Sequence, residues 1–157
     1  MIFCNTTPLI ALSGIGRLDL LPQLFSVVHV VEAVVGECAV GGPVAVPDPT
    51  SLPWLRVVVA SEPTLPGLLL SLDRGERDTL AMARKLGAER VIIDERIGRN
   101  MAELLGLKVV GTLGVLLQAK HRGLIPSFHE AVTQMQANGI FYHPTLVEKL
   151  RGEAGES

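Results

Sequence analysis

Short apolar runs alternate along the chain with segments whose apolar residues recur at helical spacing. The runs are rich in Val and Ile and stop at polar residues, glycines or prolines, so they predict buried strands at 2–5, 27–30, 54–60, 90–94 and 107–110. Helical spacing predicts helices at 9–12, 18–25, 31–38, 65–72, 75–86 and 95–105, with three short helices after residue 111. Strands that alternate with helices predict an α/β fold with a parallel sheet covered on both faces.

Capping residues give the expected ends of several elements. Thr7 is the expected N-cap of the first helix with Pro8 at its first position, and Gly87 and Gly106 are expected to end two later helices. The proline-rich stretch 41–53 predicts a surface loop. A chain of 157 residues has the size of one ordinary domain, so we expect a single domain over residues 1–150 and a frayed C-terminal tail over 151–157.

Composition excludes several classes of protein. Hydrophobic residues make up 48% of the chain, but charged residues or prolines interrupt every long apolar stretch, so no membrane span is expected. The first residues lack the pattern of a signal peptide, which predicts a cytoplasmic protein with no membrane partner. The two cysteines, Cys4 and Cys38, are too few for a disulfide framework or a structural zinc site.

The net charge of −2 provides no overall attraction to nucleic acid, so any such partner requires a local basic surface. The segment 74–99 carries seven of the 14 Lys and Arg residues. Arg96 and Arg99 fall in the first turns of a predicted helix, where a helix N-terminus also favours phosphate. A solvated helix face explains most of the other basic residues equally well.

Oxygen-bearing side chains are expected at one edge of the sheet. In parallel α/β folds the carboxyl ends of the strands form the functional edge, which points to Asn5, Asp94 and the turn at Thr112. Glu37 and Glu76 lie on predicted helices that could lean over the same edge. Such a set suits Mg²⁺ or Mn²⁺. Taken one at a time, each acid is more often a surface carboxylate or a helix cap.

Three stretches carry a resemblance to a known family. These are Cys4 to Leu12 (CNTTPLIAL), Gly75 to Ala81 (GERDTLA) and Ile92 to Arg96 (IIDER). Their order resembles PIN domains. The tail GTLGVL from Gly111, followed by Lys120 and Gly123 to Pro126, is similar to a prokaryotic branch described as nucleic-acid-binding proteins and related to VapC-type toxin ribonucleases.

This resemblance implies a three-layer α/β/α sandwich with a four- or five-stranded, mainly parallel sheet and a metal-dependent ribonuclease site. The four acidic positions of the family fall on Asn5, Glu37, Glu76 and Asp94, with Glu32 as a rival for the second. Glu95 would add a further metal ligand, and Thr6 and Thr112 would bond a water or a phosphate. The implied cofactor is Mg²⁺ or Mn²⁺. The implied partners are single-stranded or structured RNA, an antitoxin protein and a second copy of the chain in a homodimer.

The main departure from the family is at Asn5, where the first acid is usually an aspartate. An amide oxygen still ligates a hard cation but brings no charge, so metal affinity should fall. Two function classes therefore remain: a metal-dependent endoribonuclease, as the toxin of a toxin-antitoxin pair, and a non-catalytic module that binds nucleic acid or protein. A receiver-like signalling domain is a more distant third, because the paired acids expected after the first strand are absent.

Overall fold

The computed structural model describes residues 1–40, 42, 44–61 and 71–157. Within them the sheet consists of β1 (Ile2–Cys4), β2 (Val28–Val31), β3 (Leu55–Val58), β4 (Arg90–Ile92) and β5 (Lys108–Val110). Their order is β3-β2-β1-β4-β5, and every neighbouring pair is parallel. The predicted mainly parallel sheet is confirmed, with five strands.

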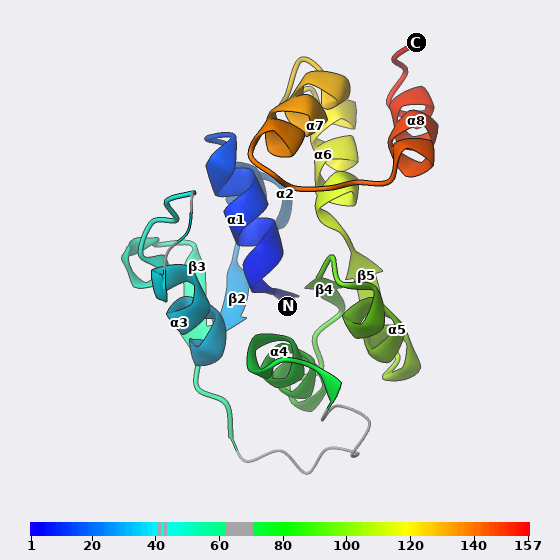
Figure 1. Ribbon diagram of the computed structural model, residues 1–157. Helices are drawn as coiled ribbons and strands as arrows, with labels where there is room; N and C mark the ends of the chain where they lie inside the picture. The colour runs from blue at the N-terminus through cyan, green and yellow to red at the C-terminus, as the bar shows by residue number, and fades with distance from the viewer. Residues whose placement is uncertain (41, 43, 62–70) are drawn as a thin grey trace.

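Helices cover both faces of this sheet, which confirms the α/β/α sandwich (Figure 1). α1, α2 and α6 lie on one side, α4 and α5 lie on the other, and α3 packs beside β2 and β3. The helices are α1 (Thr6–Gly14), α2 (Leu20–Phe25), α3 (Glu32–Val40), α4 (Arg74–Lys85), α5 (Arg96–Leu104), α6 (Thr112–His121), α7 (Phe128–Ala137) and α8 (Pro144–Glu153), with a 3-10 turn at Pro49–Ser51. None of the helices in these residues is long and apolar enough to cross a bilayer.

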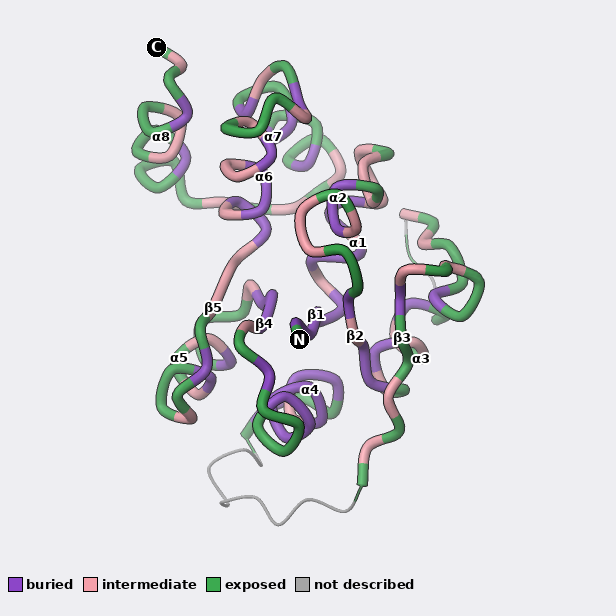
Figure 2. The backbone as a smooth tube through the Cα atoms, turned by 180° about the vertical axis from the view of Figure 1, so that it is seen from behind, coloured by how far each residue is buried: buried purple, intermediate pink, exposed green. Residues whose placement is uncertain are grey.

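The core lies between the central strands and the helices on either face. Figure 2 shows buried residues concentrated in the central strands and on the inner side of α4. Phe3, Val30 and Val91, from three adjacent strands, have no exposed surface. These strands are apolar at nearly every position because both faces of a parallel sheet are covered.

The chain reverses its direction of travel across the sheet between β1 and β4. From β1 it proceeds to β2 and β3 on one side, and from β4 to β5 on the other. Cys4 pairs with Ile92, and the Asn5 backbone N–H donates to the Ile92 carbonyl at 2.9 Å. Asn5 and Asp94 therefore follow neighbouring parallel strands, as predicted, at the switch point where such folds bind ligands.

The start of the first helix differs from its prediction. α1 begins at Thr6, so Asn5 is its N-cap, with an extended backbone, and Pro8 is its third residue. Thr7 is not the cap. Proline is tolerated anywhere in the first turn, because the N–H groups there have no partner within the helix, and so its position did not fix the helix start. The helix expected over 65–72 lies almost entirely outside the described residues.

The C-terminal tail is not frayed, contrary to the prediction for residues 151–157. Helix α8 continues to Glu153, and the Glu156 carboxylate accepts the backbone N–H groups of Phe128 at 2.7 Å and His129 at 3.0 Å. Lys120 lies 3.2 Å from the same carboxylate. The tail is held because the N-terminus of α7 has unpaired N–H groups and a positive dipole that favour an anion.

Candidate functional site

Asn5 is a buried amide at the end of β1. The residue is 4% exposed, its side chain makes no capping hydrogen bond, and its Oδ1 has no hydrogen-bond partner among the described residues. Leaving a buried acceptor unpaired costs about 1–3 kcal/mol, so such atoms in native proteins usually meet a water or an ion. This oxygen is therefore an atom at the sheet edge that a bound water or ion would pair.

Glu37 is held against the N-terminus of α4. Its carboxylate accepts the Thr6 hydroxyl and, at 3.1 Å, the Gly75 backbone N–H. A Cβ on residue 75 would lie 2.5 Å from Glu37 Oε1, so only glycine permits this approach. Glu32, the rival for the second acidic position, is the exposed first residue of α3. The structure therefore bonds Glu37, and not the exposed Glu32, to Thr6 and to the N-terminus of α4.

Glu76 is a buried carboxyl in the first turn of α4, with 6% of the residue exposed. Burial, a hydrogen bond with Asp73 and the negative charges of Asp73, Glu95 and Glu37 raise its pKa to about 8. Helix α5 also lies close to the Glu76 carboxyl: a Cβ on Gly98 would be 2.7 Å from Glu76 Oε2. A cation beside Glu76 would favour its ionised form.

Asp94 is oriented by the N-terminus of α6. Its Oδ1 accepts the Thr112 backbone N–H at 2.7 Å, and its Oδ2 accepts the Thr112 hydroxyl at 2.6 Å. A Cβ on Gly111 would lie 3.2 Å from Asp94 Oδ1 and 3.1 Å from Arg99 Nη1. A carboxylate and a guanidinium therefore border the same small space at the end of β5.

The predicted residues are thus brought to one edge as two groups. Glu37 and Glu95 are close enough to Glu76 for their charges to act on it, with Thr6 bonded to Glu37, while Asp94 is bonded to Thr112. Across the described residues, no three His, Cys, Asp or Glu side chains are arranged so that they could hold a metal ion together. The oxygen donors suit a hard cation in kind, and bound waters would have to complete its coordination.

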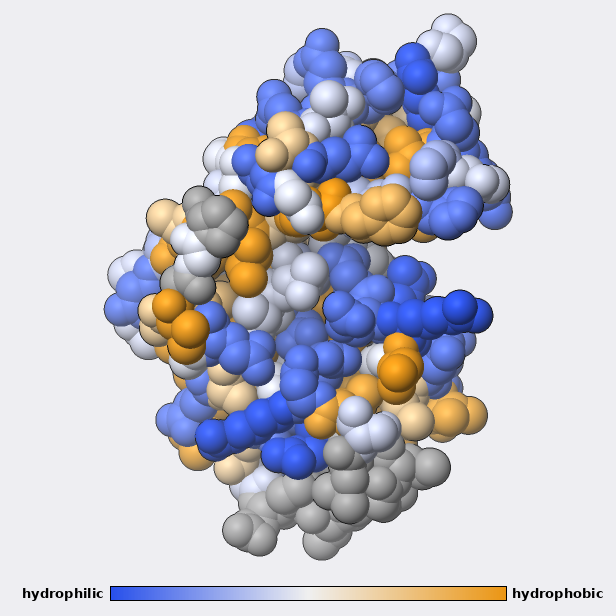
Figure 3. Space-filling view, in the orientation of Figure 1, coloured by the Kyte–Doolittle hydropathy of each residue, from blue (hydrophilic) through white to orange (hydrophobic). Residues whose placement is uncertain are grey.

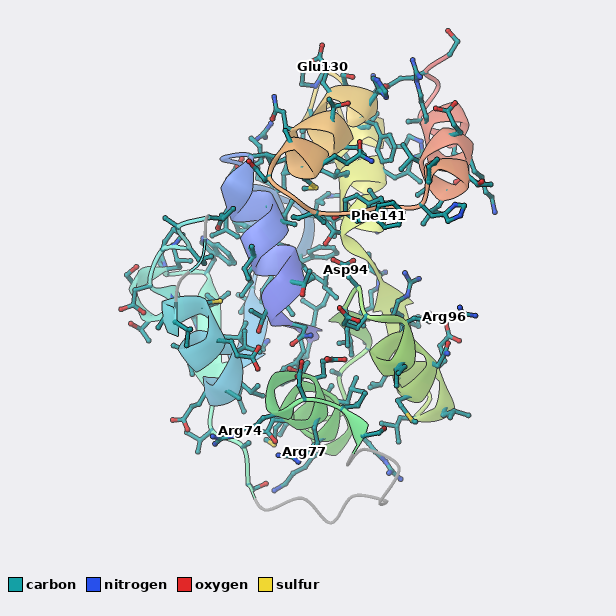
Figure 4. All side chains as sticks on the ribbon, viewed as in Figure 1. Arg74, Arg77, Asp94, Arg96, Glu130 and Phe141 are labelled. Carbon is teal, nitrogen blue, oxygen red and sulfur yellow. The ribbon has the colours of Figure 1, made fainter. Side chains whose placement is uncertain are left out.

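A cleft of about 690 Å³ opens beside the Asp94 group. Asp94, Glu95, Arg96 and Arg99 line one part of it, and an apolar wall lines the other, formed by Val109, Leu113, Leu117, Ile140, Phe141, Tyr142, Leu146 and Leu150. Figure 3 shows this hollow, with hydrophobic residues along its upper rim and hydrophilic residues along its lower rim. In Figure 4, Phe141 lies above Asp94 on the segment that leads to α8, Arg96 lies below it on α5, and Asp94 is set back toward α1.

Sequence reasoning missed three residues of this edge. Asp73 caps α4 by accepting the Glu76 N–H at 2.8 Å, and the Asp-x-x-Glu spacing of a capping box was the available signal. Phe141 and Tyr142 are adjacent aromatics in a chain with only 4% aromatic residues, a concentration that pointed to a role for the segment. Burial and the negative charge of Asp94 raise the pKa of Tyr142, whose hydroxyl donates to Met135 Sδ at 3.7 Å.

Comparison with known proteins gives one match. A family model described as a PIN domain matches residues 1–156, nearly the whole chain. No curated protein and no solved structure matches this chain. The family match agrees with the parallel five-stranded sheet. The chain belongs to the PIN-domain family.

Proposed function

We propose that this protein is a metal-dependent endoribonuclease of PIN type that uses Mg²⁺ or Mn²⁺. PIN domains suggest a nuclease-type function, and the observation that carries the finer proposal is the buried, unpartnered Oδ1 of Asn5 beside an acidic edge. Asn5, Glu37, Glu76 and Asp94, with Glu95 beside them, are the residues that would hold the ion, some of them through bound waters, because no three acidic side chains among the described residues are arranged to ligate it directly. Since Asn5 contributes no charge, we expect weaker metal affinity than in a site with four carboxylates.

The chemistry of the donor set supports a hard cation. The donors are amide and carboxylate oxygens. Burial, a hydrogen bond with Asp73 and the neighbouring negative charges raise the pKa of Glu76 to about 8, and a divalent cation would offset the repulsion between these charges. When bound, such an ion lowers the pKa of a coordinated water and offsets charge on a phosphodiester.

The protein's own residues would supply orientation and phosphate binding. Thr6 and the Gly75 N–H fix the Glu37 carboxylate, and Thr112 fixes both oxygens of Asp94. Because these carboxylates are already held, little further ordering is needed when substrate binds. Arg96 and Arg99 in the first turns of α5 would contact the RNA backbone.

The test combines metal binding with cleavage of single-stranded RNA. Asn5→Asp should tighten Mn²⁺ binding about tenfold, equivalent to about 1.4 kcal/mol, and accelerate cleavage, whereas Asp94→Asn should weaken both. Gln134→Glu, an exposed position on α7, adds the same single charge away from the site and should change neither. If Asn5→Asp and Asp94→Asn both behave like this control, the acids are not a metal site.

A second candidate is a non-catalytic module that binds nucleic acid or protein. It is favoured by the absence, in the described part of the chain, of three acidic side chains arranged to hold a metal together. RNA binding without cleavage in Mg²⁺ or Mn²⁺ would support it. The toxin role and the antitoxin partner stay predictions from the resemblance; growth arrest on expression, relieved by Asp94→Asn, would support the toxin role. The predicted homodimer is tested by light scattering.

A further inference from the structure

The cleft beside Asp94 has two chemically different sides. On the α5 side are Arg96 and Arg99, and on the other is Phe141, which is 79% exposed although it belongs to an apolar wall. Its neighbours Ile140 and Tyr142 are partly buried and packed against the core. The segment is therefore anchored on both sides of Phe141, and the ring is presented to the cleft by a fixed backbone.

We propose that this cleft holds one unpaired nucleobase of an RNA strand, stacked on the Phe141 ring, with the adjoining phosphate at Arg96 and Arg99. This inference rests on the proposed function in taking RNA as the ligand, and it adds that the strand is single at the cleft. Paired bases cannot stack on a protein ring without leaving their own stack, so a duplex would not use this surface.

Two of the four charged residues that line the cleft are arginines, which suit a phosphate group of the occupant, while Asp94 and Glu95 balance their charge. Arg74 and Arg77, from the same basic stretch, lie within 4 Å of Asp78, whereas Arg96 and Arg99 form no ion pair with any described residue. Two guanidinium groups opposite an exposed aromatic ring match the combination of phosphate contact and base stacking that single-stranded nucleic acid uses. The volume of about 690 Å³ lies within the usual range of ligand sites.

The arrangement also explains how the strand would reach the acidic edge. Asp94 lines the same cleft as Phe141 and Arg96 and is set back from both toward α1 (Figure 4). A base held on Phe141 and a phosphate held at Arg99 would leave the sugar-phosphate backbone passing beside Asp94. Phe141 would therefore act as a positioning residue for the strand, and it has no part in the bond cleavage itself.

The experiment measures binding of a short fluorescein-labelled oligouridylate by fluorescence anisotropy in EDTA and low salt, so that cleavage does not interfere. Phe141→Ala should weaken binding about tenfold, Phe141→Trp should retain it, and Phe141→Leu should resemble the alanine variant because it lacks a π-face. The control Leu104→Ala removes a side chain of a residue that is 74% exposed on α5 and does not line the cleft. It should bind like wild type.

The inference is overturned if Phe141→Ala or Phe141→Leu binds the oligouridylate as tightly as wild type, the latter result indicating an apolar protein-docking surface instead. It is also overturned if Phe141→Ala weakens binding of the same oligouridylate paired with its complement as much as it weakens binding of the single strand. Failure of the nuclease proposal looks different: Phe141 would still control RNA affinity, but neither Mn²⁺ binding nor cleavage would be detected.

Discussion

Replacement of Glu76 by glutamine tests the crowding of negative charge at the sheet edge. In the metal-free protein, burial and the neighbouring Asp73, Glu95 and Glu37 raise the pKa of Glu76 from 4.5 to about 8. The folded protein therefore keeps this proton up to about pH 8, while the unfolded chain releases it near pH 4.5. Because the folded state binds more protons in this interval, the free energy of unfolding falls as pH rises from about 4.5 to about 8.

The size of the effect follows from the interval between the two pKa values. About 3.5 pH units correspond to an upper limit of about 5 kcal/mol, at about 1.4 kcal/mol for each unit. Glu95 and Asp73 are exposed, and solvent screening weakens their share, so we expect about 2–4 kcal/mol. Glu76→Gln keeps the size and a hydrogen-bond donor, so the variant should match wild type near pH 5 and exceed its stability by that amount near pH 9.

Urea unfolding in EDTA across this pH range measures the effect. Glu32→Gln is the matched control, since it removes an exposed carboxylate from α3 and should leave the pH profile unchanged. Mn²⁺ should then stabilise the wild type and hardly change Glu76→Gln. Parallel pH profiles for wild type and Glu76→Gln would refute the reasoning, because Glu76 would then titrate alike in the folded and unfolded states.

Two further predictions concern contacts that the structure makes explicit. Glu156→Gln should lower the free energy of unfolding by about 1–2 kcal/mol at neutral pH. The N–H donors and Lys120 lower the pKa of Glu156 to about 2, so the stabilisation by this carboxylate is present above pH 4.5 and is lost as pH falls toward 2. Thermal melts at several pH values would show this loss. Gly98→Ala should lower the free energy of unfolding by about 1–3 kcal/mol and weaken Mn²⁺ binding, because the new Cβ would lie 2.7 Å from Glu76 Oε2. The control Gly36→Ala, on α3 with open space around it, should raise the free energy of unfolding by about 0.5–1 kcal/mol.

The fold was predictable because its strands are short apolar runs bounded by clear stop signals. All five predicted runs overlap a strand, and the expected helix ends at Gly87 and Gly106 coincide with positive φ angles of 68° and 78°. Strand ends were less accurate, with β4 ending at Ile92 and not Asp94. Inter-strand hydrogen bonding decides where a strand ends, and a local pattern of apolar residues does not report it.

The site was predictable only in part, because its decisive contacts join distant residues. Glu32 and Glu37 share a helix and a charge, and the choice between them depended on Gly75, 38 residues along the chain from Glu37. The exposure of Phe141 likewise depends on where α8 packs, and the ordered tail on contacts between Glu156 and α7. Spacing along the chain carries no information about such approaches, whereas strand ends and helix starts are local features.

Asparagine at position 5 has a second consequence that follows from the charges around it. Burial, a hydrogen bond with Asp73 and the charges of Asp73, Glu95 and Glu37 already raise the pKa of Glu76 to about 8. A carboxylate in place of the buried Asn5 amide would add to this repulsion in the metal-free protein, since like charges in a partly dehydrated site repel strongly. The amide thus supplies an oxygen at lower electrostatic cost, and Asn5→Asp should bind Mn²⁺ more tightly while unfolding more readily in EDTA.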